Sequence, residues 1–191
     1  YKIVNKRQVK RYKDHKAEYL YQLPQLKRKS AAIKKINKSI MADYKKTFEY
    51  KRNLFDYFDV LKKSSHTYIF YLNKCKVTYN QKGYVSFKFT SSWYAGGIGE
   101  TKDYGLTYRL RDGKKMTVQD VVYGKRSSVK KKIADTYAKK VYRIGYKYIM
   151  KMKYSDIDFY VKPGKKGCVC FGPYQPMGGH GRSVIVLKGK I

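Results

Sequence analysis

The amino-acid sequence predicts an α+β fold of two intimately packed helix-on-antiparallel-sheet layers. Several segments alternate apolar and polar residues with a period of two, which is the period of strands. Two longer segments repeat apolar residues every three or four positions, as amphipathic helices do. The chain of 191 residues is 42% hydrophobic and 16% aromatic, which is enough for a packed core and excludes a disordered polycation.

Residues 1–64 are expected to form an N-terminal strand–helix subdomain. The segment 15–26 has apolar residues at every second position from Ala17 to Leu23, which predicts a strand that ends at Pro24. Ser30 is a suitable N-cap for a helix. The apolar residues of this helix recur at helical spacing in Ile33, Ile36, Ile40, Tyr44 and Phe48. The helix either continues toward Leu61 or breaks near Asn53.

Residues 65–191 are expected to form a second subdomain that is rich in strands. Alternation predicts strands near residues 68–80, 84–90, 104–111, 157–161, 168–171 and 183–187, joined by turns that contain glycine. A helix is predicted over 127–146, with one apolar face made by Val129, Ile133, Tyr137, Val141 and Ile144. No linker-like composition separates the two subdomains, so we expect them to share an interface.

The charge is strongly positive, because 45 Lys and Arg residues face 13 Asp and Glu residues and give a net charge of +32. Such an excess repels itself, so we expect acidic surroundings that offset the repulsion. Lysine outnumbers arginine by 36 to 9. Lysine acts as a mobile point charge, whereas arginine reads phosphates bidentately. The composition therefore favours diffuse attraction to a polyanion, such as a wall polymer, a lipid surface, an acidic glycan or nucleic acid.

Two lysine-rich helix faces are the candidate polyanion-binding sites. They lie opposite the predicted apolar faces and comprise Lys34, Lys35 and Lys38 in the first helix and Lys131, Lys132, Lys139 and Lys140 in the second. A nucleic-acid ligand is disfavoured, because arginine is scarce and no known reader motif is present.

Aromatic residues beside the glycine loops are the candidate contacts for a sugar or a protein partner. Trp93 and Tyr94 precede Gly96 and Gly97, and Tyr174 lies before a second glycine-rich stretch. The backbone N–H groups of the first loop could cradle an anion. However, no helix begins after this loop, so a tight turn between strands is the favoured interpretation. We expect most of the 22 tyrosines to serve packing.

The sequence holds little that is typical of catalysis or metal binding. Cys75 either bridges to Cys168 or Cys170, or all three are buried thiols. Cys168 and Cys170 share one side of a strand and His180 follows them, which is only a weak zinc pattern. No nucleophile elbow is present, and the acidic pairs are typical of helix caps and ion-pair partners. We therefore expect a non-enzyme without metal or cofactor.

Several short motifs resemble one known family. They are Val77-Thr78-Tyr79-Asn80, Tyr94-Ala95-Gly96-Gly97, Phe159-Tyr160-Val161 and Pro173-Tyr174, in this order. Together they resemble the extracytoplasmic domain shared by the peptidoglycan deacetylase PdaC and the anti-sigma factor RsiV. The resemblance makes residues 65–191 the PdaC/RsiV-like subdomain. It implies a secreted or membrane-anchored protein of the bacterial cell envelope, whose tether would lie upstream of Tyr1.

The resemblance also implies an alternative to wall-polymer binding. The anti-sigma members bind lysozyme through a loop that corresponds to residues 171–181, which makes Pro173 and Tyr174 candidate contacts for a protein ligand. Two positions differ from the family pattern, since Glu100 follows the first glycine loop without its histidine and Gln175 replaces a glutamate. Lysozymes are typically cationic, and a partner of charge +32 would repel them. An anionic wall polymer or glycan is therefore the expected ligand.

Overall fold

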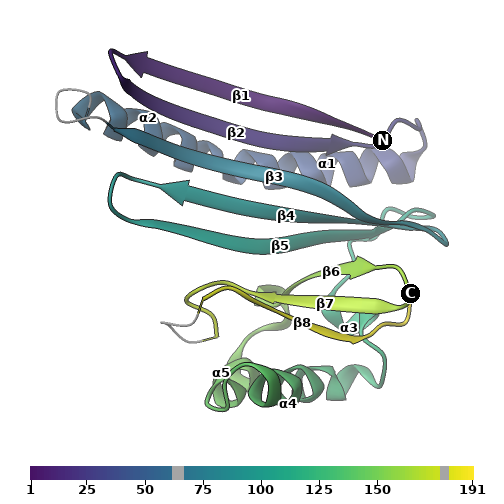
Figure 1. Cartoon of the computed structure of the whole chain (residues 1–191). Helices are drawn as coiled ribbons and strands as arrows, with labels where there is room; N and C mark the ends of the chain where they lie inside the picture. The colour runs from purple at the N-terminus through teal and green to yellow at the C-terminus, as the bar shows by residue number, and fades with distance from the viewer. Residues whose placement is uncertain (62–66, 177–180) are drawn as a thin grey trace. The chain divides into compact units, whose positions relative to one another are not determined.

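The structure is a computed structural model that describes residues 1–61, 67–176 and 181–191 (Figure 1). It confirms the α+β class. The five-stranded sheet has the order β1 (Lys2–Tyr12), β2 (His15–Gln25), β3 (Tyr68–Gln81), β4 (Tyr84–Tyr94), β5 (Gly99–Arg109). The three-stranded sheet has the order β6 (Asp158–Lys162), β7 (Lys166–Phe171), β8 (Ser183–Lys188). The helices are α1 (Ala31–Lys46), α2 (Phe48–Leu61), α3 (Val118–Val121), α4 (Val129–Lys140) and α5 (Gly145–Lys151).

The chain divides into two compact units. Unit 1 comprises Tyr1–Cys75 and Thr90–Thr101, and unit 2 comprises Lys76–Phe89 and Lys102–Ile191. The boundary expected between residues 64 and 65 lies outside the described residues, so the two subdomains stay a prediction. No helix in the described ranges combines the length and the apolar character that crossing a membrane requires.

Unit 1 begins with an antiparallel hairpin whose first strand the sequence analysis did not find. β1 pairs with β2 along its whole length, from Lys2 opposite Gln25 to Tyr12 opposite His15. β1 is mostly exposed and rich in lysine and arginine, as edge strands often are. It therefore shows no apolar alternation.

The pair β2–β3 is parallel, whereas an antiparallel sheet was expected. β2 and β3 run parallel, with Lys16 opposite Tyr68 and Tyr21 opposite Asn73. A parallel pair requires a long crossover, and here α1 and α2 lie between the two strands in the chain. The larger sheet is consequently mixed.

The core of unit 1 lies between β2 and the two helices. Tyr19, Tyr21 and Leu23 of β2 are buried, as are Ile33, Ile36 and Ile40 of α1, which were predicted from their helical spacing. The Tyr21 hydroxyl donates to Asp43 Oδ2 over 2.9 Å and fastens α1 to the strand.

The first helix breaks at Thr47 rather than near Asn53. The Thr47 hydroxyl donates to the carbonyl of Tyr44 over 2.6 Å and lies 2.5 Å from the Tyr19 hydroxyl. The Thr47 side chain thus bonds to a backbone carbonyl in the last turn of α1, and its contact with Tyr19 fixes it against the core. α2 starts at the next residue.

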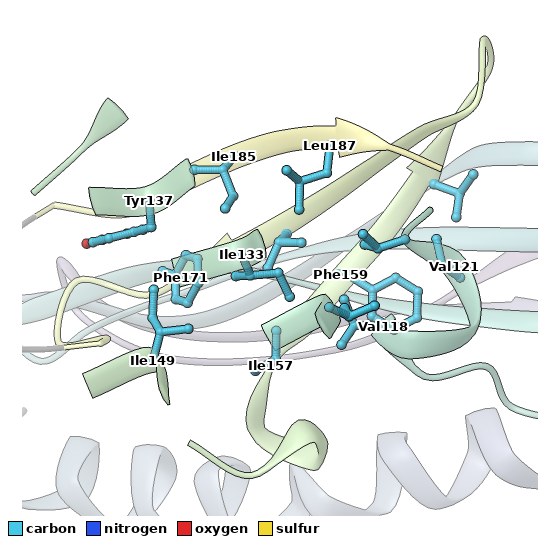
Figure 2. Close-up of a cluster of buried hydrophobic side chains, with 14 of the residues drawn as sticks. Val118, Val121, Ile133, Tyr137, Ile149, Ile157, Phe159, Phe171, Ile185 and Leu187 are labelled. Carbon is cyan, nitrogen blue, oxygen red and sulfur yellow. The ribbon is translucent and has the colours of Figure 1, made fainter. Parts of the chain in front are cut away.

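The core of unit 2 is formed by the three-stranded sheet and its helices. Figure 2 shows Ile133 and Tyr137 of α4 and Ile149 of α5 pointing toward Phe171 of β7 and Ile185 of β8, all of them buried. The rings of Tyr137 and Phe171 meet edge to face, with centroids 4.8 Å apart. Both neighbouring strand pairs of this sheet are antiparallel.

The helix predicted over 127–146 is two helices. α4 ends at Lys140, and Val141 and Ile144, which were predicted to be on its apolar face, are 40% and 47% exposed. α5 begins at Gly145, where an added Cβ would lie 2.3 Å from Cε1 of Tyr137. The break lets α5 bring Ile149 into the core, which a continuous helix would not do.

Within unit 2, β5 and β6 approach each other closely at a glycine. A Cβ on Gly105 would lie 2.0 Å from the carbonyl oxygen of Phe159. Nearby, Ser86 Oγ accepts a hydrogen bond from the Val161 N–H over 2.9 Å and lies 2.8 Å from Thr107 Oγ1. A glycine of β5 and hydroxyl-bearing residues of β4 and β5 therefore make the contact with β6.

Candidate functional site

An aromatic pocket of about 340 Å³ lies within unit 1. Its lining comes from Tyr50, Asn53, Leu54 and Tyr57 of α2, Phe70 and Tyr71 of β3, and Trp93, Tyr94 and Ala95 at the end of β4. The volume and the mainly apolar lining are typical of small-ligand sites. Two of the residues singled out from the sequence, Trp93 and Tyr94, line this pocket.

Ring-to-ring contacts hold the pocket together. Tyr50 stacks on Tyr71 with centroids 5.2 Å apart, and Phe70 lies 5.9 Å from Tyr94. Tyr71 is buried, and its hydroxyl accepts a hydrogen bond from Ser91 Oγ over 3.3 Å. Helix and sheet are thus linked through the rings that form the pocket wall.

Three of the lining tyrosines remain open to solvent. Tyr50 is 54% exposed, Tyr57 is 44% exposed and Tyr94 is 38% exposed. An aromatic side chain that stays at the surface keeps apolar area in contact with water, which is unfavourable. An exposed apolar patch of this kind often marks a contact site.

The glycine loop beside the pocket is a tight turn, as favoured from the sequence. The Ala95 N–H donates to the carbonyl of Ile98 over 2.9 Å. Gly96 and Gly97 have φ values of 80° and 154°, a region that favours glycine. A Cβ on Gly99 would lie 2.6 Å from the Trp93 carbonyl oxygen, so the turn also fixes the backbone next to the pocket.

The lining of the pocket is uncharged, in a strongly basic chain. None of its lining residues carries a charge at neutral pH. α2 bears Glu49, Asp56 and Asp59 against Lys51 and Arg52, which gives this helix a net charge of −1 in a chain of +32. These acidic residues do not line the pocket, and Asp59 forms an ion pair with Lys10 over 3.0 Å.

The lysine face of α1 is a separate surface of unit 1. Lys34, Lys35 and Lys38 are exposed, opposite the buried isoleucines of the same helix. None of the three forms an ion pair in the part of the chain that the structure describes. Asp43 is the one acidic residue of α1, and it accepts the hydrogen bond from Tyr21. Among the described residues, no carboxylate is therefore paired with the lysines of this face.

The lysine face of α4 belongs to unit 2 and is partly compensated. Lys131 forms an ion pair with Asp135 over 2.9 Å, and Lys132 Nζ donates to the carbonyl of Tyr123 over 2.7 Å. Lys139 and Lys140 are exposed in the last turn of the helix. No ion pair or side-chain hydrogen bond of Lys139 or Lys140 is found among the described residues, so they are the lysines of α4 most available to a ligand.

Pro173 and Tyr174 also lie in unit 2, in a turn closed by the Gln175 N–H on the carbonyl of Gly172 over 3.0 Å. Tyr174 is 63% exposed. Residues 177–180 of the same loop, including His180, lie outside the described residues. A protein ligand at residues 171–181 therefore stays a prediction.

The cysteines are three free, buried thiols, which is one of the two alternatives that the sequence left open. Burial raises the pKa of Cys75 to about 12 and also raises the pKa values of Cys168 and Cys170. Protonated thiols are poor nucleophiles. Among the described residues, no group of three or more His, Cys, Asp or Glu side chains is arranged to hold a metal ion.

The sequence analysis missed the α2 and β3 side of the pocket. α2 carries aromatic residues around more than one face, with Phe55 and Phe58 buried and Tyr50 and Tyr57 exposed. That surplus of aromatic residues is the signal that could have indicated a second function for this helix.

Comparison with solved structures finds the same fold in two proteins of the DUF3298 family. The protein from Bacteroides fragilis has a TM-score of 0.65 and 11% sequence identity, over 97% of this chain and 88% of that chain. The protein from Pseudomonas aeruginosa PAO1 has a TM-score of 0.53 and 12% identity, over 98% of this chain and 88% of that chain. No protein-family model and no curated protein matches this sequence. At these identities the likeness is one of fold alone.

Proposed function

We propose that this chain is a non-catalytic binding domain of the bacterial cell envelope that associates with anionic wall or surface polymers. The observation that carries the proposal is the exposed lysine face of α1, where Lys34, Lys35 and Lys38 have no acidic partner among the described residues. Lys139 and Lys140 of α4 add a second cationic surface.

The physical basis is long-range attraction between fixed charges of opposite sign. A chain of net charge +32 gains from dense negative charge, because the polymer both attracts the lysines and relieves their mutual repulsion. Lysines of this kind need no shaped phosphate site, which agrees with the shortage of arginine.

The location in the cell envelope is a separate proposal, and it rests on the resemblance of the sequence motifs to the PdaC/RsiV family. The two solved neighbours are DUF3298 proteins, and their fold is compatible with the PdaC/RsiV resemblance. In that family the domain lies outside the cytoplasm, where wall polymers supply the negative charge.

The absence of catalysis is likewise proposed from the chemistry of the available groups. The buried thiols stay protonated, and Asp59, Asp120 and Asp135 form ion pairs with neighbouring basic residues. These carboxylates act as charge partners, in keeping with binding rather than bond cleavage.

The test is binding to purified Gram-positive walls that retain their teichoic acids, with the same walls stripped of these polymers as the reference. Binding should fall steeply as salt rises from about 50 mM to about 200 mM, since released counterions drive such association. Replacing Lys34, Lys35 and Lys38 by Gln should weaken binding at least about tenfold, because each lysine near an anionic surface contributes about 1 kcal/mol.

A matched variant separates the lysine face from total charge. Replacing Lys162, Lys165 and Lys166 by Gln removes the same charge from the exposed β6–β7 turn region instead of from α1. The proposal requires a smaller loss in this variant. Binding that is insensitive to salt, or equal for native and stripped walls, would contradict it.

A further inference from the structure

We infer that the open edge of β1 binds an acidic, extended segment of another protein, which adds to the larger sheet as an extra strand. The inference concerns a different element and a different class of partner from the wall polymers proposed above, and it does not depend on them. It follows from the length, the backbone geometry and the charge of β1.

β1 is a long and regular strand with one edge open. It pairs with β2 residue by residue over all 11 positions, so it has no bulge, and it contains no proline. It is the outermost strand of the larger sheet, and no described strand pairs with its other edge (Figure 1). Edge strands are usually short or interrupted, because a long open edge is a template for another strand. Addition of an extended segment to such an edge is a common mode of peptide recognition.

The backbone groups that point to the open edge follow from the pairing of β2. The Lys16 N–H donates to the carbonyl of Thr67, just before β3, over 2.9 Å, so the backbone groups of Lys16 point away from β1. Backbone groups alternate between the two edges of a strand, so those of His15 point toward its register partner Tyr12. The same alternation along β1 directs the N–H and C=O groups of every second residue to the open edge. These residues are Ile3, Asn5, Arg7, Val9 and Arg11.

The cations of β1 lie on both faces of the strand. They recur at every fourth residue, which keeps each set on one face, and β1 has no carboxylate among them. One face carries Lys2, Lys6 and Lys10, and the other carries Arg7 and Arg11. Ion pairs within unit 1 occupy Arg7 and Lys10. The exposed Lys2, Lys6 and Arg11 form no ion pair among the described residues and are open to a partner.

This charge selects the partner. Like charges that face each other on neighbouring strands are destabilising, whereas opposite charges are stabilising. A second copy of this chain would set the cations of its own β1 against these, so self-association through this edge is disfavoured. An acidic polysaccharide has the complementary charge but no backbone that matches the row of N–H and C=O groups. An acidic polypeptide strand gains both the hydrogen bonds and the ion pairs.

The probe for this site is a synthetic acidic peptide labelled with fluorescein, whose anisotropy reports binding. It repeats Glu-Glu-Thr-Val, so that each face of the strand carries glutamate at every fourth position and matches the spacing in β1. At about 150 mM salt the Debye length is about 8 Å, which screens loose attraction between distant charges. We expect saturable binding by the parent protein under this condition.

Amide hydrogen exchange, followed by NMR, identifies the backbone groups that the peptide covers. In the free protein the amides of Asn5, Arg7 and Val9 point to the open edge and should exchange fast, whereas those of Lys6 and Gln8 point to β2 and should exchange slowly. Bound peptide should slow the first set at least about tenfold. Attraction of charges alone would not protect every second amide.

A second peptide separates strand addition from charge. It has the same sequence with two consecutive N-methyl groups at its centre, which block both edges of the strand and leave the charge unchanged. It should bind at least about tenfold more weakly, because the lost donors leave carbonyl groups of β1 unpaired.

Protein variants locate the site. Lys2→Gln, Lys6→Gln and Arg11→Gln together should weaken binding of the first peptide about tenfold, through the loss of cross-strand ion pairs. The α1 variant described above, in which three lysines are replaced by Gln, removes the same charge from another element and is the matched control. Its affinity for the peptide should change less than about twofold, since screening limits the reach of these lysines.

Three outcomes would overturn the inference. One is no binding of the first peptide up to concentrations on the order of 1 mM. Another is equal binding of the N-methylated peptide, which would make β1 a further surface for polyanions. The third is binding that protects no alternate amides of β1. Wall binding that fails while the peptide still binds as described would contradict the proposed function alone.

Discussion

At the scale of single residues, the close approach of β5 and β6 makes Gly105 hard to replace. Gly105→Ala would place a Cβ 2.0 Å from the Phe159 carbonyl oxygen, and a backbone atom cannot yield as a side chain does. We expect the free energy of unfolding to fall by more than about 3 kcal/mol, the range of severe core substitutions. Urea unfolding followed by circular dichroism measures it.

Gly181→Ala is the control for this prediction. A Cβ on Gly181 meets nothing within 4 Å, so the variant should unfold at nearly the same urea concentration as the parent protein. Equal stability of the two variants would show that β5 and β6 do not approach as described.

A second prediction at this scale concerns Glu18. Hydrogen bonds from Lys16, Arg7 and Tyr68 lower the pKa of this carboxyl from 4.5 to about 2. A pKa that is lower in the folded state contributes stability above pH 4.5, and this stability is lost as the pH falls toward 2. Glu18→Gln should therefore reduce the difference in unfolding free energy between pH 6 and pH 3. A variant with the same pH dependence as the parent protein would contradict the depressed pKa.

At the scale of elements, the sequence predicted those that bury one regular face. β2, the first part of α1 and β8 all alternate or repeat strictly, and each was found close to its predicted bounds. β1 was not predicted, because an edge strand that is mostly exposed needs no alternating apolar face. The break at Thr47 was missed because it involves Tyr19, which is 28 residues away in the sequence. The break before Gly145 was missed because the apolar spacing continues through Val141 and Ile144, although the structure leaves both residues exposed.

The candidate site was predictable to the same extent. Trp93 and Tyr94 could be singled out because they adjoin a glycine loop, where side chains often reach solvent. Tyr50 and Tyr57 could not be singled out, because a helix with aromatic residues on several faces does not show which face the sheet will cover. The lysine faces were visible because charge on a helix opposite an apolar stripe is nearly always solvated.

At the scale of the whole molecule, the charge predicts how stability depends on salt. With +32 charges on 191 residues, repulsion among lysines opposes the compact state. Salt shortens the Debye length from about 30 Å at 10 mM to about 8 Å at 150 mM, and so weakens this repulsion. The midpoint temperature of thermal unfolding should therefore rise as salt increases over this range. Salt also weakens the ion pairs of Glu18 and Asp120, but we expect this effect to be smaller.

A soluble polyanion should have a larger effect than simple salt, because it binds the folded state and concentrates negative charge against the lysine faces. Differential scanning calorimetry at 10 mM salt, with and without polyphosphate, measures this directly, and the variant lacking Lys34, Lys35 and Lys38 should respond less than the parent protein. If the midpoint falls as sodium chloride is added, attraction within the chain outweighs repulsion, and the protein does not depend on external negative charge.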